Sequence, residues 1–489
     1  MNSFDPAGFV SLVALIGLVI LVAGLVSGLN ERLGIPAVAL FLGLGTVLGP
    51  YGLGLVDFGL GSPILLTIAI LSLVLVLFTD AVSVDRDALR THARIAGIVL
   101  GPGTLLAAAL TAVAAWKLLG LHPAAAAILG AALSSTDPVM MRGLLRLPGV
   151  PAAARYPLRI ESGLNDVVVL PIVLLGMVFL GAAGTPVSGT VGKVALSVFV
   201  LGPAAGILVA WVAVRLLVYA RGWMGMRRDY ESLYVLGVAF TAYAVAELFH
   251  ASGFMAAFAA GLTVASLDVE LCDCFHDYGE ATAEMLLLLS FIAFGASLIW
   301  TGLEVLDGPH LGVAAVALLG RPLVLMLLLP RRGVDPLARR LVIWFGPRAL
   351  ASLLLVLLPI IAGIPGAAQL FPMTALVVLL SVVGHGAMLA WATHRLKSRA
   401  EPLTSLAGRG PELPGAKLVA HPELITFDEL AALQAAKAEV VVLDVRTARG
   451  YEISPLTAKG AIRLSPTAPA ENAASLALPR EAWLVAYCS

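Results

Sequence analysis

Charged side chains are scarce in this chain of 489 residues. They make up 13% of it, against roughly 25% in ordinary soluble domains, while 60% of the residues are hydrophobic. This imbalance excludes an ordinary soluble globular protein and indicates a membrane protein. The formal net charge is zero, so the composition gives no sign of a nucleic-acid partner.

Cysteine is scarce as well, and the first residues of the chain contain no basic side chain. The three cysteines, Cys272, Cys274 and Cys488, do not make a disulfide framework. Met1–Gly8 contains no lysine or arginine, so it lacks the positive n-region of a signal peptide. We therefore expect the first apolar run to be retained as a membrane span.

Long apolar runs recur to about residue 395, each close to the roughly 20 residues that a helix needs to cross a bilayer. The predicted fold class is an all-α polytopic membrane protein of about 13 transmembrane helices, followed by a small cytoplasmic α/β domain. Three of the runs are short, so the count is open by one. The predicted spans are Phe9–Leu29, Ile35–Leu48, Pro63–Val82, Ile95–Leu119, Pro123–Leu145, Pro157–Ala182, Val191–Tyr219, Leu233–Phe249, Gly253–Leu267, Met285–Trp300, Leu311–Leu329, Leu341–Ala362 and Thr374–Ala392.

Basic residues gather in alternate loops between these spans. Clusters lie around Arg86, Arg142, Arg227 and Arg331, and only the predicted loop Asp268–Glu284 on that side lacks them. Loops rich in lysine and arginine stay in the cytoplasm. The pattern predicts a multi-pass inner-membrane protein with its N-terminus outside and its C-terminus in the cytoplasm.

Six ionisable residues fall inside the predicted spans, where each costs several kcal/mol. Four of them lie six to nine residues from the nearest loop arginine, which is roughly 9–14 Å along a helix. Four chain segments thus bring charge to one depth near the middle of the bilayer. Four acids face two arginines, so the site has an excess of negative charge suited to protons or small cations. The six residues are Asp80, Asp137, Glu161, Asp166, Arg321 and Arg348.

Two of the spans contain a proline near the same depth. Pro138 opposes the carbonyl of Ser134, and Pro347 opposes that of Ile343, so both helices should break there. These spans cross in opposite directions, and paired broken helices in inverted halves are typical of a secondary transporter with a midplane site. A simple proline kink is the alternative, but it does not explain the charged residues that flank both prolines.

Several motifs resemble those of monovalent cation:proton antiporters. They are "LFTDA" (Leu77–Ala81), "SSTDPV" (Ser134–Val139), "ESGLND" (Glu161–Asp166), "RPL" (Arg321–Leu323) and "GPRAL" (Gly346–Leu350). The match is to the sodium/proton exchanger branch, whose sixth span carries Asn-Asp, and it covers the chain from about residue 9 to 396. The resemblance implies a homodimer in which a mobile core domain slides against a dimerisation domain. The sequence "VMMRG" departs from the small residues expected after "DP".

The resemblance makes Asp166 the carboxylate that holds either a proton or the transported cation. Asp137, Thr136 and Ser162 would supply further hard oxygens, which suit a small hard cation. Asn165 replaces the second adjacent carboxylate of the Asp-Asp branch, which implies electroneutral exchange of one cation per proton. We expect Na⁺, or Li⁺, as the cation, with K⁺ as the alternative, and no cofactor.

The remaining charges have predicted roles too. The family pattern implies that Glu161 pairs with Arg321 as a structural brace, while Arg348 faces the broken helix ends. Asp80 is either a third acidic ligand or an entrance charge. His385 is either a pH sensor, because imidazole titrates near neutrality, or a histidine hydrogen-bonded between helices.

Other functions fit the sequence less well. A gated cation channel would need neither a carrier carboxylate nor paired broken helices. A membrane-anchored sulfurtransferase would leave the buried charges unexplained. The stretch "CDCFHD" (Cys272–Asp277) is incomplete as a zinc site. We therefore expect a transporter rather than an enzyme.

The composition changes after the last span. Residues 1–396 form the predicted transmembrane domain, 397–420 a polar linker and 421–489 a small α/β domain with a buried strand at Val440–Val445. The motifs "LDVRTARGY", "KGAIRLSP" and "LVAYCS" resemble a rhodanese-like domain, with Cys488 at the position of its sulfur-carrying cysteine. The reactive loop of that family is incomplete here, so sulfur transfer is not expected. An unrelated α/β tail is the alternative.

Overall fold

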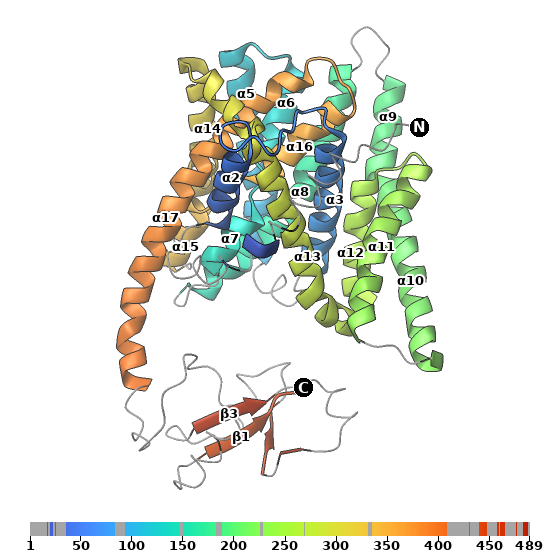
Figure 1. The fold of residues 1–489 in the computed structure, drawn as a ribbon, viewed down its shortest axis with the longest axis vertical. Coiled ribbons are helices and arrows are strands. Elements are labelled where there is room, and N and C mark those ends of the chain that lie inside the picture. The colour runs from blue at the N-terminus through green and yellow to red at the C-terminus, as the bar shows by residue number, and fades with distance from the viewer. Residues whose placement is uncertain are drawn as a thin grey trace. The chain divides into compact units, whose positions relative to one another are not determined.

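The structure is a computed structural model of the chain, and it divides into two compact units, Met1–Ala400 and Glu401–Ser489 (Figure 1). In the first unit it describes residues 36–83, 93–145, 150–181, 188–224, 228–267, 269–330 and 335–400. In the second it describes residues 401–407, 440–446, 460–464 and 483–487. A few isolated residues are described as well.

Helices make up the described part of the first unit (Figure 1). Two of the long helices, α5 and α10, are continued on their N-terminal side by a π-helical turn, at residues 99–103 and 197–201. The α-helices are α2 (Ala37–Leu48), α3 (Pro63–Val82), α5 (Thr104–Leu119), α6 (Pro123–Ala132), α7 (Pro138–Leu145), α8 (Ala152–Gly181), α9 (Ser188–Leu196), α10 (Gly202–Met224), α11 (Arg228–Leu248), α12 (Gly253–Leu267), α13 (Val269–Ala296), α14 (Gly308–Leu328), α15 (Pro336–Trp344), α16 (Leu350–Ile361) and α17 (Leu370–Ala407).

The structure supports a polytopic membrane protein but not 13 full-length spans. Among the described residues, 7 helices are long and apolar enough to cross a membrane, or 8 if a helix pair bent by 50° is one span. Four more apolar helices, α2, α6, α12 and α16, have only 10–17 residues, fewer than the roughly 20 that a full crossing takes. The predicted span Phe9–Leu29 lies almost entirely outside the described residues.

One predicted segment type is wrong, and a second segment is partly helical. The loop expected over Asp268–Glu284 is helical from Val269 onward, as the first part of α13. The linker expected over residues 397–420 begins as helix, because α17 continues to Ala407. Residues 397–407 are rich in Leu, Ala, Lys, Arg and Glu, which favour helix even without an apolar face. Residues 269–284 contain no lysine or arginine and form helix all the same, so polarity alone was a poor guide to the backbone.

Close packing between helices relies on glycine. The missing Cβ of Gly45 in α2 would lie 2.3 Å from the carbonyl oxygen of Ile292 in α13. A Cβ on Gly206 in α10 would lie 2.0 Å from the carbonyl oxygen of Ala256 in α12. Small residues of this kind let membrane helices approach at backbone distance.

The second unit contains a parallel sheet of three strands in the order β2-β1-β3. These are β1 (Val440–Asp444), β2 (Ile462–Arg463) and β3 (Trp483–Tyr487), so the strand predicted at Val440–Val445 is confirmed. The carboxylate of Asp444, at the end of β1, accepts hydrogen bonds from the guanidinium of Arg446 and the hydroxyl of Tyr487. Hydrogen bonding to Arg446 holds the pKa of Asp444 well below its usual range.

Candidate ion-binding site

Two spans of the first unit are broken at the prolines that predicted the breaks. Helix α6 ends at Ala132 and α7 begins at Pro138, while α15 ends at Trp344 and α16 begins at Leu350. The segments between them, residues 133–137 and 345–349, form no continuous helix. We call them the first and second crossing segments.

The two buried arginines bind the carbonyl groups that these prolines release. One guanidinium nitrogen of Arg348 lies 2.8 Å from the oxygen of Ser134 and 3.1 Å from that of Ser135. A nitrogen of Arg321 lies 3.0 Å from the oxygen of Ile343. A carbonyl without a partner inside a membrane costs several kcal/mol, so each arginine stabilises one of the breaks.

Asp137 joins the two crossing segments. Its backbone N–H donates to the carbonyl of Pro347 over 2.9 Å. One carboxylate oxygen accepts from the N–H of Met140 and the other from the N–H of Leu350, both at 3.0 Å. Because these N–H groups belong to the first turns of α7 and α16, the one negative charge of Asp137 lies against the positive ends of two half-helices.

Asp166 and Asn165, on α8, contact the first crossing segment. The Asp166 side chain is 2% exposed and accepts a hydrogen bond from the hydroxyl of Ser135. The Asn165 amide nitrogen donates to the hydroxyl of Thr136 over 2.5 Å. The amide oxygen of Asn165 is buried and forms no hydrogen bond within the described part of the chain. The structure therefore brings Asp166, Asn165 and Thr136 together.

Glu161, one turn before Asn165, forms a buried ion pair with Arg321. Two guanidinium nitrogens lie 2.7 and 2.5 Å from the two carboxylate oxygens, a bidentate geometry. A Cβ on Gly346 would lie 2.8 Å from the same guanidinium. A side chain at that position of the second crossing segment would therefore have to displace the guanidinium of the ion pair.

Two further candidates, Asp80 and Ser162, lie beside α8 and on α8 respectively. Asp80, on α3, is half-buried beside Gly163, whose missing Cβ would lie 3.5 Å from the Asp80 Cβ. The Ser162 hydroxyl donates to the carbonyl of Arg159 in its own helix over 3.2 Å. Asp80 is thus placed against the helix that carries Asp166, and Ser162 lies on that helix one turn away.

Comparison with known proteins identifies the family. The description "Sodium/hydrogen exchanger, transmembrane" matches residues 17–395 of the chain. The chain belongs to the sodium/hydrogen exchanger family. The predicted family is thereby confirmed for the first unit, and it is a family of antiporters rather than of enzymes.

The relatives of this exchanger include curated potassium antiporters. The K⁺/H⁺ antiporter NhaP of Alkalimonas amylolytica is 27% identical over 381 residues, which is 76% of this chain and 65% of that protein. The K⁺/H⁺ antiporter NhaP2 of Shewanella sp. strain ANA-3 is 28% identical over 391 residues, 78% of this chain and 66% of the relative. The chain thus spans just under two thirds of the length of these relatives.

A solved structure shares the fold of this exchanger. The sodium proton antiporter MjNhaP1 of Methanocaldococcus jannaschii, solved at pH 8, superposes with a TM-score of 0.63 at 20% identity. The match covers 77% of this chain and 98% of that one. At this identity the likeness shows the fold.

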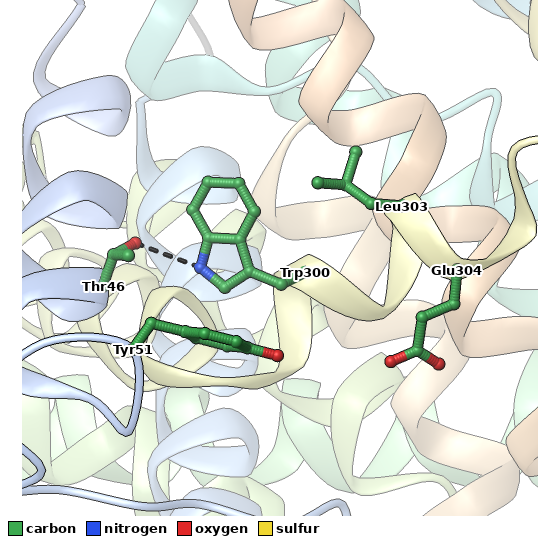
Figure 2. Close-up of a pocket in the computed structure, with 5 residues that line it drawn as sticks. All are labelled: Thr46, Tyr51, Trp300, Leu303 and Glu304. Atoms are coloured by element: carbon green, nitrogen blue, oxygen red, sulfur yellow. Dashed lines mark hydrogen bonds between the residues drawn. The ribbon is translucent and has the colours of Figure 1, made fainter.

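A pocket lies between the end of α2 and the 3₁₀ turn Leu298–Val305 (Figure 2). It has a volume of about 490 Å³. The indole N–H of Trp300 donates to the hydroxyl of Thr46 over 3.1 Å, and Tyr51 meets the indole edge-on. Its described lining is Thr46, Tyr51, Trp300, Leu303 and Glu304. None of the candidate ion-binding residues is among them.

The sequence did not point to Ser135 or Ser381. Ser135 hydrogen-bonds Asp166, and Ser381, on α17, accepts a 2.6 Å hydrogen bond from the backbone N–H of Arg348. Serine in an apolar helix has no distinctive spacing, although Ser381 is one turn before His385, which was a candidate. The predicted motif at Cys272–Asp277 lies in helix α13, not in a loop. Its side chains and Cys488 lie outside the described residues.

Proposed function

We propose that the protein exchanges a monovalent cation for a proton across the membrane, with Asp166 as the carboxylate that both ions share. The observation that carries this proposal is that Asp166, buried beside the first crossing segment, forms no ion pair among the described residues. Glu161 is neutralised by Arg321, and Asp137 faces two helix N-termini. Asp166 is therefore the acid best able to take up and release a cation or a proton.

The groups around Asp166 support a cation site. The unpartnered amide oxygen of Asn165 offers a hard oxygen of the kind that small cations bind. We propose Thr136, Ser162 and Asp137 as further ligands, and Asp80 as an acid that joins them from α3. Asp137 already accepts two N–H groups, but an ionised carboxylate has about four acceptor sites, so these bonds leave capacity for a cation.

We propose K⁺ as the transported cation. The curated relatives, at 27% and 28% identity, are named K⁺/H⁺ antiporters. This supports the potassium alternative better than the Na⁺ or Li⁺ that the motifs led us to expect. The solved neighbour is titled a sodium proton antiporter, so Na⁺ is the natural competitor to test beside K⁺.

The mode of transport is part of the proposal. A single carboxylate next to the neutral Asn165 fits one cation per proton, and hence electroneutral exchange. Breaks in two helices allow the site to open alternately to the two sides of the membrane. A homodimer, with the N-terminus outside and the C-terminus in the cytoplasm, is proposed from the family resemblance and the loop arginines.

The test uses inside-out vesicles with an acid interior and a pH-sensitive dye. K⁺, Na⁺ or Li⁺ is added to wild type, to Asp166→Asn and to Glu304→Gln, a control that removes an exposed acid. We expect K⁺ to dissipate the proton gradient in wild type and in the control, independently of a clamped membrane potential, and Asp166→Asn to be inactive. A response to Na⁺ alone would show that Na⁺, not K⁺, is the transported cation. Full activity in Asp166→Asn would refute the carrier assignment.

We further propose that residues 421–489 form a rhodanese-like domain. The parallel order β2-β1-β3 and the acidic residue at the end of β1 support an α/β architecture of that kind. In this proposal Cys488 would follow β3 directly, at the strand end where the resemblance places the sulfur-carrying cysteine.

A further inference from the structure

The second crossing segment, Phe345–Ala349, is held at both ends by helix α17. Near its C-terminal end, the backbone N–H of Arg348 donates to the Ser381 hydroxyl over 2.6 Å. Ser381 is 0% exposed. This bond satisfies a backbone donor that the break in the helix would otherwise leave without a partner in a water-free interior.

His385, one turn after Ser381, holds the other end. Its Nδ1 lies 3.0 Å from the Ser381 hydroxyl oxygen and 3.2 Å from the Ser381 carbonyl oxygen. The imidazole meets the ring of Phe345 edge-on, with centroids 6.0 Å apart. A chain of contacts therefore runs from Arg348 through Ser381 and His385 to Phe345.

This chain continues to the proposed ion carrier. The Arg348 side chain donates to the carbonyls of Ser134 and Ser135, and the Ser135 hydroxyl donates to Asp166. A displacement of the Arg348 backbone would move the guanidinium that fixes these carbonyls. The first crossing segment, and with it the surroundings of Asp166, depends on the position of the second.

We infer that Ser381 and His385 are positioning residues for cation binding. Together they form a polar clamp that keeps Phe345–Ala349 in the arrangement that completes the site. The inference rests on the proposed exchange function and adds two residues on α17 to it. Loosening the clamp lowers the fraction of molecules in the binding-competent arrangement, and the apparent affinity falls by the same factor.

The first test is Ser381→Ala, measured as the cation concentration that gives half-maximal dequenching in the vesicle assay. We expect this KM to rise about tenfold, the equivalent of about 1.4 kcal/mol. Ser381→Thr keeps the hydroxyl and should restore KM to within about twofold of wild type. Thr374→Val is the matched control, because Thr374 is a buried hydroxyl of the same helix that bonds only to Leu370 in its own helix among the contacts seen.

KM distinguishes positioning from a purely structural role. A variant that only folds less well leaves fewer active molecules, which lowers Vmax and the yield but leaves KM unchanged. Such a result for Ser381→Ala, or an equal rise in KM for Thr374→Val, would overturn the inference. In that case, K⁺-driven dequenching by wild type and its loss in Asp166→Asn would still support the exchange function. The two proposals can therefore fail separately.

The second test treats the clamp as a unit. His385→Phe keeps an aromatic ring and removes both ring nitrogens, and we expect it to raise KM by a factor similar to that of Ser381→Ala. The double variant should have nearly the same KM as either single variant, because residues of one network do not act additively. Effects that multiply to about a hundredfold would show that the two residues act independently and would contradict the clamp.

Discussion

Four charged residues around the crossing segments have four different kinds of partner. Asp137 faces backbone N–H groups at two helix N-termini, and Arg348 faces backbone carbonyls. Glu161 has an arginine, whereas Asp166 has a hydroxyl group. At the residue scale this division separates charges that have a charged or backbone partner from Asp166, which we propose as the ion carrier.

The Glu161–Arg321 ion pair should contribute strongly to stability. Glu161→Gln leaves the Arg321 guanidinium buried without its counter-charge, and we expect a loss of about 3–5 kcal/mol of unfolding free energy. The measurement is thermal unfolding of the detergent-solubilised protein. Replacing both residues by apolar ones of similar size, as in Glu161→Leu with Arg321→Met, should recover only part of the loss, because Arg321 also binds the Ile343 carbonyl.

An exposed pair provides the control for this prediction. At the start of α14, Nδ1 of His310 lies 2.6 Å from a carboxylate oxygen of Asp307. Solvent screens the charges of this exposed pair. Asp307→Asn keeps an N-cap residue and should leave the unfolding temperature unchanged. A similar fall in both variants would contradict the special role of the buried pair.

At the element scale, helix pairs are set by glycines at backbone contact. Gly45 of α2 faces the backbone of α13, whereas nothing lies within 4 Å of the missing Cβ of Gly43 on the same helix. Gly45→Ala must push α2 away from α13, and overpacking of this kind costs about 1–3 kcal/mol. Gly43→Ala adds the same methyl group without a clash.

We expect Gly45→Ala to lower the thermal unfolding temperature by several degrees and Gly43→Ala to leave it unchanged or slightly higher. Fluorescence-detected size exclusion after heating measures both variants side by side. Equal behaviour of the two would mean that α2 does not pack against α13 as the structure has it.

The short helices are the other feature of this scale. Helices α6, α7, α15 and α16 have 8–12 residues each, because each pair is one apolar run divided by its proline. The prolines in these runs predicted the two breaks correctly. The apolar runs could not predict that polar segments such as the start of α13 also form helix, since a polar sequence and helix formation are compatible.

At the scale of the whole molecule, the candidate site lies in one unit. Every candidate ion-binding residue belongs to Met1–Ala400. We therefore predict that a chain ending after Ala407, where α17 ends, retains cation/proton exchange with KM and Vmax within about twofold of the full chain. The vesicle assay measures this, with Asp166→Asn in the shortened chain as the inactive control.

Loss of exchange in the shortened chain, at an equal amount of protein in the vesicles, would show that residues 408–489 are needed for transport. In that case transport by the first unit would depend on the C-terminal residues. A change in KM alone would indicate that these residues alter the affinity of the ion site for the cation.

Local chemistry was enough for a large part of this description. Apolar runs fix the membrane class, and Pro138 and Pro347 fix where two helices break, because a proline removes a donor and displaces one particular carbonyl. The motifs "ESGLND" and "SSTDPV" placed the family and named Asp166, Asn165 and Thr136 as residues of one site. The membrane class and the breaks depend only on neighbours along the chain, whereas the family and the site residues depend on the resemblance of these motifs to known antiporters.

Apart from the Glu161–Arg321 pair, which the family pattern implied, the pairing of the groups was decided by the tertiary structure alone. Arg348 binds the carbonyl of Ser134, 214 residues away, and Asp137 accepts from the N–H of Leu350, 213 residues away. Several donors and acceptors at the same depth could satisfy one another in more than one way. Only the packing of α6, α8, α16 and α17 around the two crossing segments selects one arrangement, because a hydrogen bond forms only between groups within about 3 Å.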